Sequence, residues 1–444
     1  MLKSLRLFQG ARADPSVAVA QPSLTSAGSN GRHATPPAPT LNRYLTHQPI
    51  VDADYRLIGY SLSLKERVPI PVLPGAVDLE QMKEEMLLVS VIDLAYQQAL
   101  GNHLTFLSLR PETLHNPLLD LLPPEKVVLA IASNAAADDA LIARCAHLAE
   151  HGIPLLLDGD PTPETAPLLP YCRYARLDVG NVDVLSLGDR LNGLRAYGAQ
   201  RIVAGNVSSM ETFEACRKLS FSLFHGNYLN QPRQTTERKV DAQRLRVMEL
   251  LNLVIREAEV PRLAEKLKQD VGLVYRILRY INSPINALLQ PVQSIEQALV
   301  WLGRDQLYRW LTLLLFNVGP ADNRSQTLLQ NALVRARFME KLGTDRFSPP
   351  MRGSLFIVGI LSQMDALLDM PLPKAIEPLN LAPDITDALL GGKGLFAPYL
   401  EMAMACERLD MDTVEKLANE YRLDSNTVNL AHIDSIIWAE RLQH

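Results

Sequence analysis

Carboxylates that follow two predicted strands are the main candidates for chemistry in this chain of 444 residues. Asp158 and Asp160 come after the apolar run Leu155–Leu157, and Asp178 comes directly after Arg176-Leu177 in a second run. Two separated acids can bind a metal ion, so these residues could form a vestigial metal site. Turn formation and helix capping are the alternative, because Asp-Gly-Asp-Pro is a favourable turn sequence.

The second half of the chain lacks the histidines that a metal-dependent phosphohydrolase of the His-Asp type requires. Such an enzyme holds its metal ions with several converging histidines and aspartates. Beyond His225 the sequence contains only His432 and the terminal His444. We therefore expect no metal site there and predict that His432 is an ordinary surface or partly packed histidine. The Gly391–Gly394 segment lacks the spacing of a phosphate-binding loop and is predicted to be a turn between helices.

The composition is that of a folded protein without a general attraction to nucleic acid or membranes. Hydrophobic residues make up 47% and charged residues 21% of the chain, and the formal net charge is -5. No uncharged apolar run reaches the length of about 18 residues that a membrane span needs. The four cysteines lie far apart and are predicted to be buried or incidental thiols in a reducing compartment. We expect a cytoplasmic protein.

Short strand-like runs alternate with helical stretches between residues 46 and 231. They include strand-like Leu104–Leu109 and Val127–Ala132, a long helix at 77–100 and a helix at 112–121. This alternation predicts parallel strands with crossover helices. The number of units favours a (β/α)8 barrel, and a doubly wound open sheet is the alternative.

The two ends of the chain differ from this α/β region. Residues 232–444 carry only helical patterns, interrupted by breakers such as Pro349-Pro350, and are predicted to form an all-helical domain. Residues 1–42 are rich in alanine, proline, serine and glycine, with Asp14 as their one acid. Such a segment buries too little apolar surface to fold alone, so we expect a disordered tail.

Several segments of the first half, taken in order, resemble the EAL domain, the barrel phosphodiesterase of cyclic di-GMP. Gln48–Asp52 (QPIVD) and Leu57–Lys65 (LIGYSLSLK) resemble its opening hairpin, with Ser61-Leu62-Ser63 in place of the Glu-Ala-Leu signature. The later segments that are similar are Thr105–Leu109, Val128–Ile131, Leu157–Asp160, Ala175–Asp178, Val203–Gly205 and Phe224–Gly226. The resemblance implies a TIM-type barrel.

The resemblance also indicates what stands where the family has its metal ligands and catalytic lysine. These positions hold Ser61, Ser108, Ala130, Asp158 followed by Gly159, Arg176 and Gly205. In the family, such ligands hold two metal ions that activate water. With most of them replaced, the resemblance implies a degenerate barrel that is not an enzyme and has no metal or other cofactor, with Asp158, Asp178 and Arg176 as a vestigial site. Cyclic di-GMP is not expected to bind, because the same positions contact the nucleotide.

The second half resembles the HDOD domain, a relative of the His-Asp phosphohydrolases that lacks their metal residues. The matching stretches are Leu263–Asp270 (LAEKLKQD), Ile277–Pro284 (ILRYINSP) and Ser294–Gly303 (SIEQALVWLG). Proteins that join an EAL and an HDOD domain are bacterial regulators of motility, biofilm formation and related signalling.

The resemblance leads us to predict a non-catalytic scaffold or adaptor that acts through a signalling protein partner. By analogy with the family, the partner surface lies near Asn282, Ser283 and Pro284, and the alternative is that Asn282 and Ser283 only cap and end helices. No nucleic-acid or membrane partner is expected. Two other functions stay open: a cyclic di-GMP receptor without turnover, and a weakly active cyclic di-GMP phosphodiesterase.

Overall fold

The computed structural model describes residues 44–65, 88–89, 103–132, 135, 137–180, 184–233, 240–282, 291–318 and 322–442. The tail predicted at residues 1–42 and most of the helix predicted at 77–100 lie outside these residues. Both therefore stay predictions.

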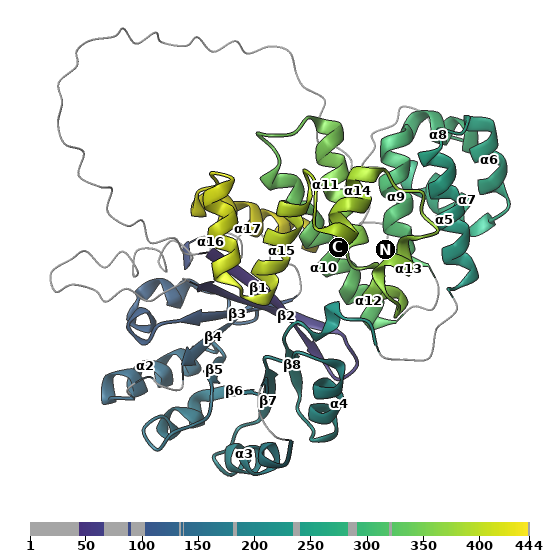
Figure 1. Ribbon diagram of the computed structural model, residues 1–444. Helices are drawn as coiled ribbons and strands as arrows, with labels where there is room; N and C mark the ends of the chain where they lie inside the picture. The colour runs from purple at the N-terminus through teal and green to yellow at the C-terminus, as the bar shows by residue number, and fades with distance from the viewer. Residues whose placement is uncertain are drawn as a thin grey trace, which may run out of the picture.

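The first half is a closed barrel, so the open-sheet alternative is wrong (Figure 1). Strands pair in chain order, and the last pairs with the first. They are β1 (Tyr44–Asp52), β2 (Leu57–Lys65), β3 (Leu104–Leu109), β4 (Val127–Ala132), β5 (Leu155–Asp158), β6 (Cys172–Asp178), β7 (Arg201–Gly205) and β8 (Leu223–His225). The first strand runs antiparallel to both of its neighbours, because the β1–β2 connection is a tight hairpin, and the other pairs are parallel.

Alternate strand residues fill the interior of the barrel. They form one buried cluster, which consists of Ile50, Phe106, Val128, Ala130, Leu156, Tyr174, Val203 and Leu223. Because side chains alternate between the two faces of a strand, the other set packs outward against the surrounding helices. The barrel therefore has a packed core, and any site must lie at its ends.

Helices and short 3-10 turns surround the barrel. The α-helices are α2 (Asp139–Glu150), α3 (Val184–Ala196) and α4 (Met210–Lys218), and the 3-10 turns are η2 (Pro111–His115), η3 (Pro117–Leu121), η4 (Ala166–Tyr171) and η5 (Tyr228–Asn230). The helix predicted at 112–121 is thus two 3-10 turns. Pro117 has no N–H to continue a helix, and the Asn116 side chain caps the second turn by accepting a hydrogen bond from the Leu118 amide.

The second half is all-helical, as predicted. Its first helices are α5 (Ala242–Ile255), α6 (Val260–Lys268), α7 (Val271–Ile281), α8 (Ile295–Leu302), α9 (Arg304–Asn317) and α10 (Asn323–Leu342). The remaining ones are α11 (Pro349–Leu361), α12 (Met364–Leu368), α13 (Leu372–Ile376), α14 (Pro383–Thr386), the π-helical turn η7 (Asp387–Gly391), α15 (Ala397–Arg408), α16 (Met411–Glu420) and α17 (Ser425–Arg441). Gly392 and Gly394 adopt positive φ angles between η7 and α15, which confirms the predicted turn.

The helix α10 is the centre of the helical half and packs against α11, α15 and α17. It approaches α11 closely at Gly359, where a Cβ atom would lie 2.5 Å from the Cα atom of Ala336. By length and composition the stretch Pro349–Leu368 could cross a membrane, but 67% of its apolar window is buried inside the protein. It is therefore a core helix of this fold.

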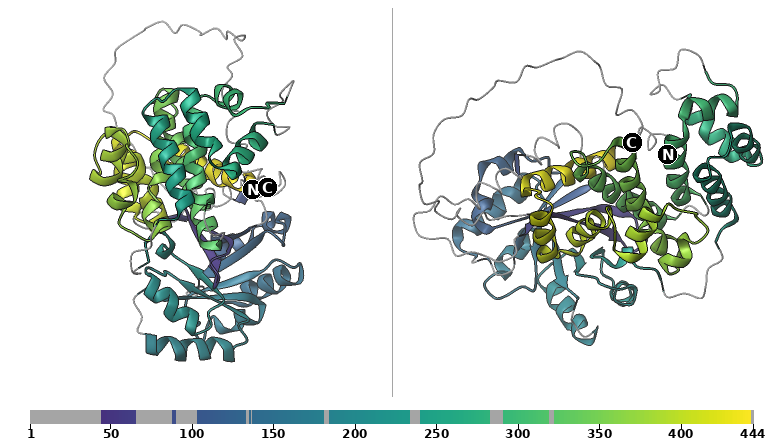
Figure 2. Two further views of the ribbon diagram at one scale, coloured as in Figure 1. Left: turned by 90° about the vertical axis from the view of Figure 1, so that its right-hand side faces the viewer. Right: turned by 45° about the horizontal axis from the view of Figure 1, so that its top comes forward.

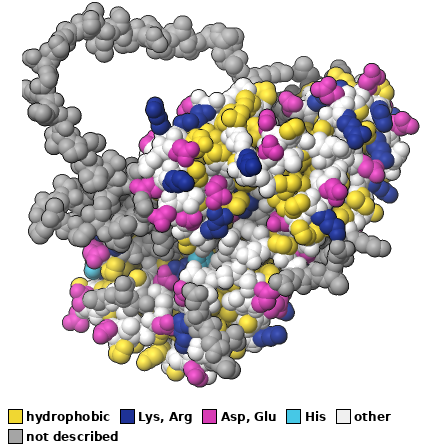
Figure 3. All heavy atoms as spheres, viewed as in Figure 1, with side chains coloured by type: hydrophobic (Ala, Val, Ile, Leu, Met, Phe, Trp, Pro, Cys, Tyr) yellow, Lys and Arg dark blue, Asp and Glu magenta, His cyan; other side chains and the backbone are white. Residues whose placement is uncertain are grey.

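The two halves share one hydrophobic core. Helices α15 and α17 both pack on β1, and Figures 1 and 2 show them lying across this strand. Buried side chains from the barrel and from the helical half belong to one continuous cluster. On the face drawn in Figure 3, acidic and basic side chains are interspersed over both halves. The helical half is thus packed onto the barrel at β1, beside one of its open ends.

Candidate functional site

A polar cavity of about 330 Å³ lies at the carboxyl ends of the parallel strands. This is the end at which TIM-type barrels carry their active sites. It brings together all three residues of the predicted vestigial site, Asp158, Arg176 and Asp178. The other residues that line it are Thr46, Gln48, Ser61, Ser63, Ser108, Gly159, Gly205, Asn206, His225 and Leu409. We call this cavity the barrel mouth.

Arg176 is the central charge of the barrel mouth. Its Nε atom donates to Asp158 Oδ1 over 2.5 Å, and its Nη2 atom donates to the second carboxylate oxygen. Its Nη1 atom reaches the Ser61 hydroxyl only at 3.4 Å. The paired contact with Asp158 fixes the plane of the guanidinium, whose side chain is 12% exposed. One edge of a permanent cation is therefore available to a ligand.

The absence of a side chain at position 205 makes room for Arg176. A Cβ atom on Gly205 would lie 3.0 Å from Arg176 Cγ and 3.1 Å from its Cδ. A glutamate here, as the resemblance gives for the family, would compete with the arginine for the same space. Arg176 and Gly205 are therefore coupled by packing as well as by their place in the barrel mouth.

Asp178 and Asp160 serve mainly to hold loops. Asp178 accepts hydrogen bonds from the Gly180 amide at 2.8 Å and from Asn206 Nδ2 at 2.6 Å, and so ties together the loops after β6 and β7. Asp160 forms an exposed two-point contact with Arg190 and does not line the cavity. These contacts favour the turn and capping interpretation for both residues.

The donor set of the barrel mouth does not fit a pair of divalent metal ions. Across the described residues, no group of three or more histidine, cysteine, aspartate and glutamate side chains is placed to hold a metal. Asp158 already accepts from Arg176, and the remaining ligand positions carry a hydroxyl, a methyl group or no side chain. Divalent ions of this kind prefer several carboxylate oxygens. The guanidinium of Arg176, and not a metal ion, supplies the positive charge at this end of the barrel.

The helical half contributes directly to the barrel mouth, which the sequence did not indicate. Leu409, the residue directly after α15, adopts a left-handed conformation (φ 62°) and lines the cavity. Gln48 is buried in the cavity wall, and its Nε2 atom donates to the main-chain oxygen of Glu407 over 2.7 Å. More than 350 residues separate these partners in the chain, so no local pattern could have revealed the contact.

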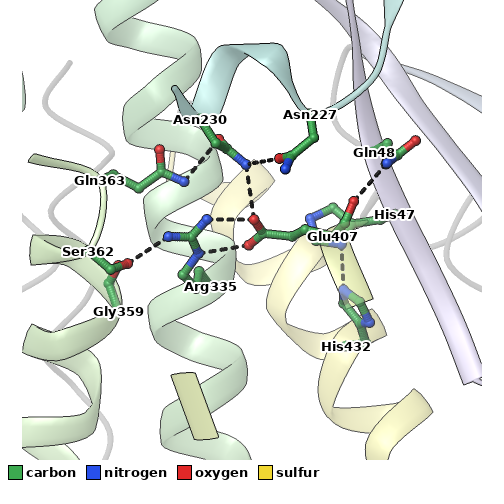
Figure 4. Close-up of polar contacts among 10 residues, drawn as sticks. All are labelled: His47, Gln48, Asn227, Asn230, Arg335, Gly359, Ser362, Gln363, Glu407 and His432. Atoms are coloured by element: carbon green, nitrogen blue, oxygen red, sulfur yellow. Dashed lines mark hydrogen bonds and ion pairs between the residues drawn. The ribbon is translucent and has the colours of Figure 1, made fainter. Parts of the chain in front are cut away.

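A buried ion pair lies behind this contact (Figure 4). Arg335 on α10 donates to both carboxylate oxygens of Glu407, over 2.8 and 2.5 Å. Asn230 of the barrel donates to the same carboxylate over 3.0 Å, and Gln363 donates to Asn230. Glu407 therefore connects three elements: its side chain holds α10 and η5, and its carbonyl holds β1.

His432 is not a surface histidine. It is 1% exposed, and its Nδ1–H donates to the Leu45 carbonyl of β1 over 2.9 Å. Its Nε2 atom therefore accepts from Nδ1–H of His47, and Figure 4 shows this contact between the two rings, whose planes are nearly perpendicular. Burial lowers the pKa of His47 to about 3, aided by the charge of Arg335. Burial and the neighbouring His47 lower the pKa of His432 well below its usual range, so both rings are neutral at pH 7.

Asn282, a residue of the predicted partner surface, has a structural contact. Its side chain donates to the Val292 carbonyl over 2.9 Å and accepts from the Val292 amide over 2.7 Å. It thereby joins the end of α7 to Val292, shortly before α8 begins, in line with the capping alternative. Ser283 and Pro284 lie outside the described residues. A partner surface in this region stays a prediction.

Comparison with known proteins extends over most of the chain. The cyclic di-GMP phosphodiesterase CdgJ of Vibrio cholerae is 25% identical over 400 residues, which cover 89% of this chain and 92% of that protein. The YuxH protein of Bacillus subtilis is 24% identical over 408 residues, 90% of this chain and 98% of that protein.

Solved EAL structures are similar to part of the chain. A standalone EAL protein of Vibrio cholerae O395, solved with cyclic di-GMP bound, has 17% identity and a TM-score of 0.33, and the match covers 43% of this chain and 91% of that one. The YkuI protein of Bacillus subtilis, solved with cyclic di-GMP and calcium, has 17% identity and a TM-score of 0.35, with coverage of 54% and 73%.

These comparisons contradict two predictions made from the sequence: that the chain is not an enzyme, and that cyclic di-GMP is not expected to bind. The relative that aligns over 89% of the chain is named a cyclic di-GMP phosphodiesterase. Both predictions rested on counting replaced metal ligands. A count of ligands does not include the charge and hydrogen-bond donors that the replacing residues bring, such as the guanidinium of Arg176.

The family model of the HDOD domain matches residues 243–375. This range runs from α5 to α13 and includes the central helix α10. Together with the closed barrel that precedes it, the match establishes the arrangement that the sequence motifs suggested. The chain joins an EAL-type barrel to an HDOD domain.

Proposed function

We propose that the barrel mouth binds cyclic di-GMP and that the chain is a cyclic di-GMP-responsive protein. The observation that carries this proposal is the guanidinium of Arg176, held flat by Asp158 with its Nη1 edge directed at a cavity of hydroxyl groups. An arginine presents a geometry that matches a phosphodiester, and the hydroxyls of Ser61 and Ser108 can donate further hydrogen bonds to its oxygens. The name of the Vibrio cholerae relative supports the choice of ligand.

The size of the barrel mouth limits how the ligand enters. At about 330 Å³ it is at the small end of the range of small-molecule pockets, roughly 300–1,000 Å³. We therefore expect one phosphate and its neighbouring ribose to enter the cavity. The rest of the dinucleotide would lie along the rim, where Leu409 of the helical half is located.

Isothermal titration with a matched pair of arginine variants tests this proposal. Arg176→Ala removes the cation of the barrel mouth and is expected to weaken cyclic di-GMP binding by 10-fold or more, as about 1.5–3 kcal/mol for a charged hydrogen bond implies. Arg190→Ala is the control, because Arg190 makes the same kind of two-point contact, with Asp160, outside the cavity. Equal affinity of the two variants would overturn the proposal.

Slow hydrolysis of cyclic di-GMP is a second candidate function, favoured by the name of the relative. In this reaction one water molecule adds across a P–O bond and opens the ring to the linear dinucleotide. The measurement is chromatography of the linear product after incubation with Mg²⁺ or Mn²⁺. We expect product in proportion to the protein and its loss in Asp158→Ala. Product formation that is unchanged in Asp158→Ala would assign the activity to a contaminant.

The helical half would bind other proteins in a way that depends on whether a ligand occupies the barrel mouth. We propose that this output occurs through a signalling protein partner in the cytoplasm, which the sequence led us to expect. The contact of α15 with the barrel mouth supports such a role, because the end of this helix would meet a bound ligand. Co-purification of partners with wild-type chain but not with Arg176→Ala is the expected result when cyclic di-GMP is present. Identical partners for both would contradict this role.

A further inference from the structure

A second cavity lies between the barrel and the helical half and has no role in the function proposed so far. It has a volume of about 540 Å³, well within the size range of small-molecule sites. Its walls include the apolar side chains of Leu389, Leu400, Met404 and Leu417. Its polar side is formed by Asn230, Arg335 and Glu407, which Figure 4 shows converging from three elements. We call it the junction cavity.

The charges that line the junction cavity do not balance. Arg335 forms a two-point ion pair with Glu407, and Arg408 forms an ion pair with Glu401 over 2.7 Å. The fifth charged side chain of the lining, Asp365 at the start of α12, belongs to neither of these two pairs. Its carboxylate accepts a hydrogen bond from the Ala366 amide over 2.7 Å, and within the described residues it forms no ion pair.

Asp365 is partly buried. Burial raises the pKa of this carboxyl, although the Ala366 amide and the charges of Arg335 and Arg324 oppose the rise. A desolvated carboxylate gains most from a partner that brings a positive charge and donates hydrogen bonds. The junction cavity offers such a partner an apolar wall on one side and the carboxylate on the other.

We propose that the junction cavity binds a small organic cation, an amine or guanidinium on an aliphatic body. The charged group would donate to Asp365, and the aliphatic body would pack against Leu400 and Met404. An organic anion would meet the three carboxylates of Asp365, Glu401 and Glu407, two of them already paired with arginines. A bare metal ion would find too few ligands, since no cluster of metal-binding side chains occurs in the described residues.

Titration calorimetry on the full chain tests this proposal with aliphatic probes of opposite charge. The probes are n-hexylamine and agmatine, and the control is hexanoate, which has an aliphatic body like that of hexylamine and the opposite charge. Both cations are expected to bind saturably, and hexanoate is not. Hexanoate binding as well as hexylamine, or no saturable binding of either cation, would overturn the proposal.

Two variants test whether the cation binds at Asp365. Asp365→Asn keeps the size of the side chain and is expected to weaken hexylamine binding at least 10-fold, whereas Asp345→Asn, at an exposed position outside the cavity, leaves it unchanged. Met404→Lys would place an ammonium group within the cavity and is also expected to weaken hexylamine binding at least 10-fold. Circular dichroism verifies that each variant is folded. Wild-type affinity in a folded Asp365→Asn or Met404→Lys protein would contradict the assigned position.

Discussion

Two buried histidines, one from each half, make the stability of the fold depend on pH. In the folded chain His47 and His432 are neutral, because burial lowers the pKa of both rings. In the unfolded chain an ordinary histidine has a pKa of about 6.5. The unfolded chain therefore binds more protons than the folded chain between about pH 3 and pH 6.5. The stabilisation is complete above this range and falls as the pH falls below about 6.5.

We predict that lowering the pH from 7.5 to 5.5 reduces the free energy of unfolding by about 1–3 kcal/mol through these two groups. Urea unfolding followed by circular dichroism measures the change. His432→Gln removes one of the two titrating rings. This variant is expected to be less stable at pH 7.5, but its free energy of unfolding should fall less than that of the wild type when the pH is lowered to 5.5. His151→Gln, at an exposed position, is the control. An equal loss in wild type and His432→Gln would show that other groups cause the pH dependence.

The contact between α10 and α11 depends on a glycine at one position and tolerates a side chain at another. A Cβ atom on Gly359 would lie 2.5 Å from the backbone of Ala336, which real contacts do not reach, so the helices would have to separate. On the same helix, a Cβ atom on Gly353 would meet its nearest atom, Arg309 Nη2, at an ordinary 3.6 Å. Gly359 therefore sets the spacing of the two helices at the centre of the helical half.

Gly359→Ala is expected to destabilise the protein by about 1–3 kcal/mol, the usual effect of overpacking a core. Gly353→Ala is expected to be neutral or to stabilise by up to about 1 kcal/mol, because alanine favours the helix. Thermal and urea unfolding of the two variants measure the difference. Similar stability of both variants would mean that α10 and α11 can separate at Ala336 without a loss in the free energy of unfolding.

The helical elements and the barrel strands were largely predictable, and their exceptions have local causes. Leu155–Leu157 and Val127–Ala132 are continuous apolar runs, which is the signal of strands buried on both faces. The antiparallel direction of β1 follows from the short connection between Asp52, where β1 ends, and Leu57, where β2 begins. Pro117 explains why residues 112–121 form two 3-10 turns instead of one helix.

The contacts across the whole molecule could not be predicted from the sequence. Asp158 and Asp178 are predicted from their places at the ends of strands, which meet at one end of a barrel, whereas Arg176 is predicted only from the resemblance to the EAL domain. The pairing of His47 with His432 and of Gln48 with Glu407 joins residues more than 350 positions apart. Such contacts leave no periodic signal, so the sequence predicts a surface or partly packed His432, whereas the structure buries it fully.

The ion pair of Arg335 and Glu407 joins α10 to α15 within the helical half, and Glu407 also accepts hydrogen bonds from Asn230 and Gln48 of the barrel. Glu407→Ala leaves the buried guanidinium of Arg335 without its carboxylate and is expected to cost about 3–5 kcal/mol. Glu401→Ala, on the same helix, breaks the surface pair with Arg408 and is expected to cost less than about 1 kcal/mol. Urea unfolding monitored by tryptophan fluorescence compares them. Equal losses would contradict a special role of Glu407.

The central claim is that the guanidinium of Arg176, rather than a bound metal ion, supplies the charge that attracts cyclic di-GMP to the barrel mouth. The most direct measurement is isothermal titration of cyclic di-GMP into the full chain in the presence of EDTA. We expect saturable binding with an affinity close to that in Mg²⁺. No saturable heat in EDTA, with binding restored by Mg²⁺ or Ca²⁺, would contradict it and would place a metal ion at the centre of the site.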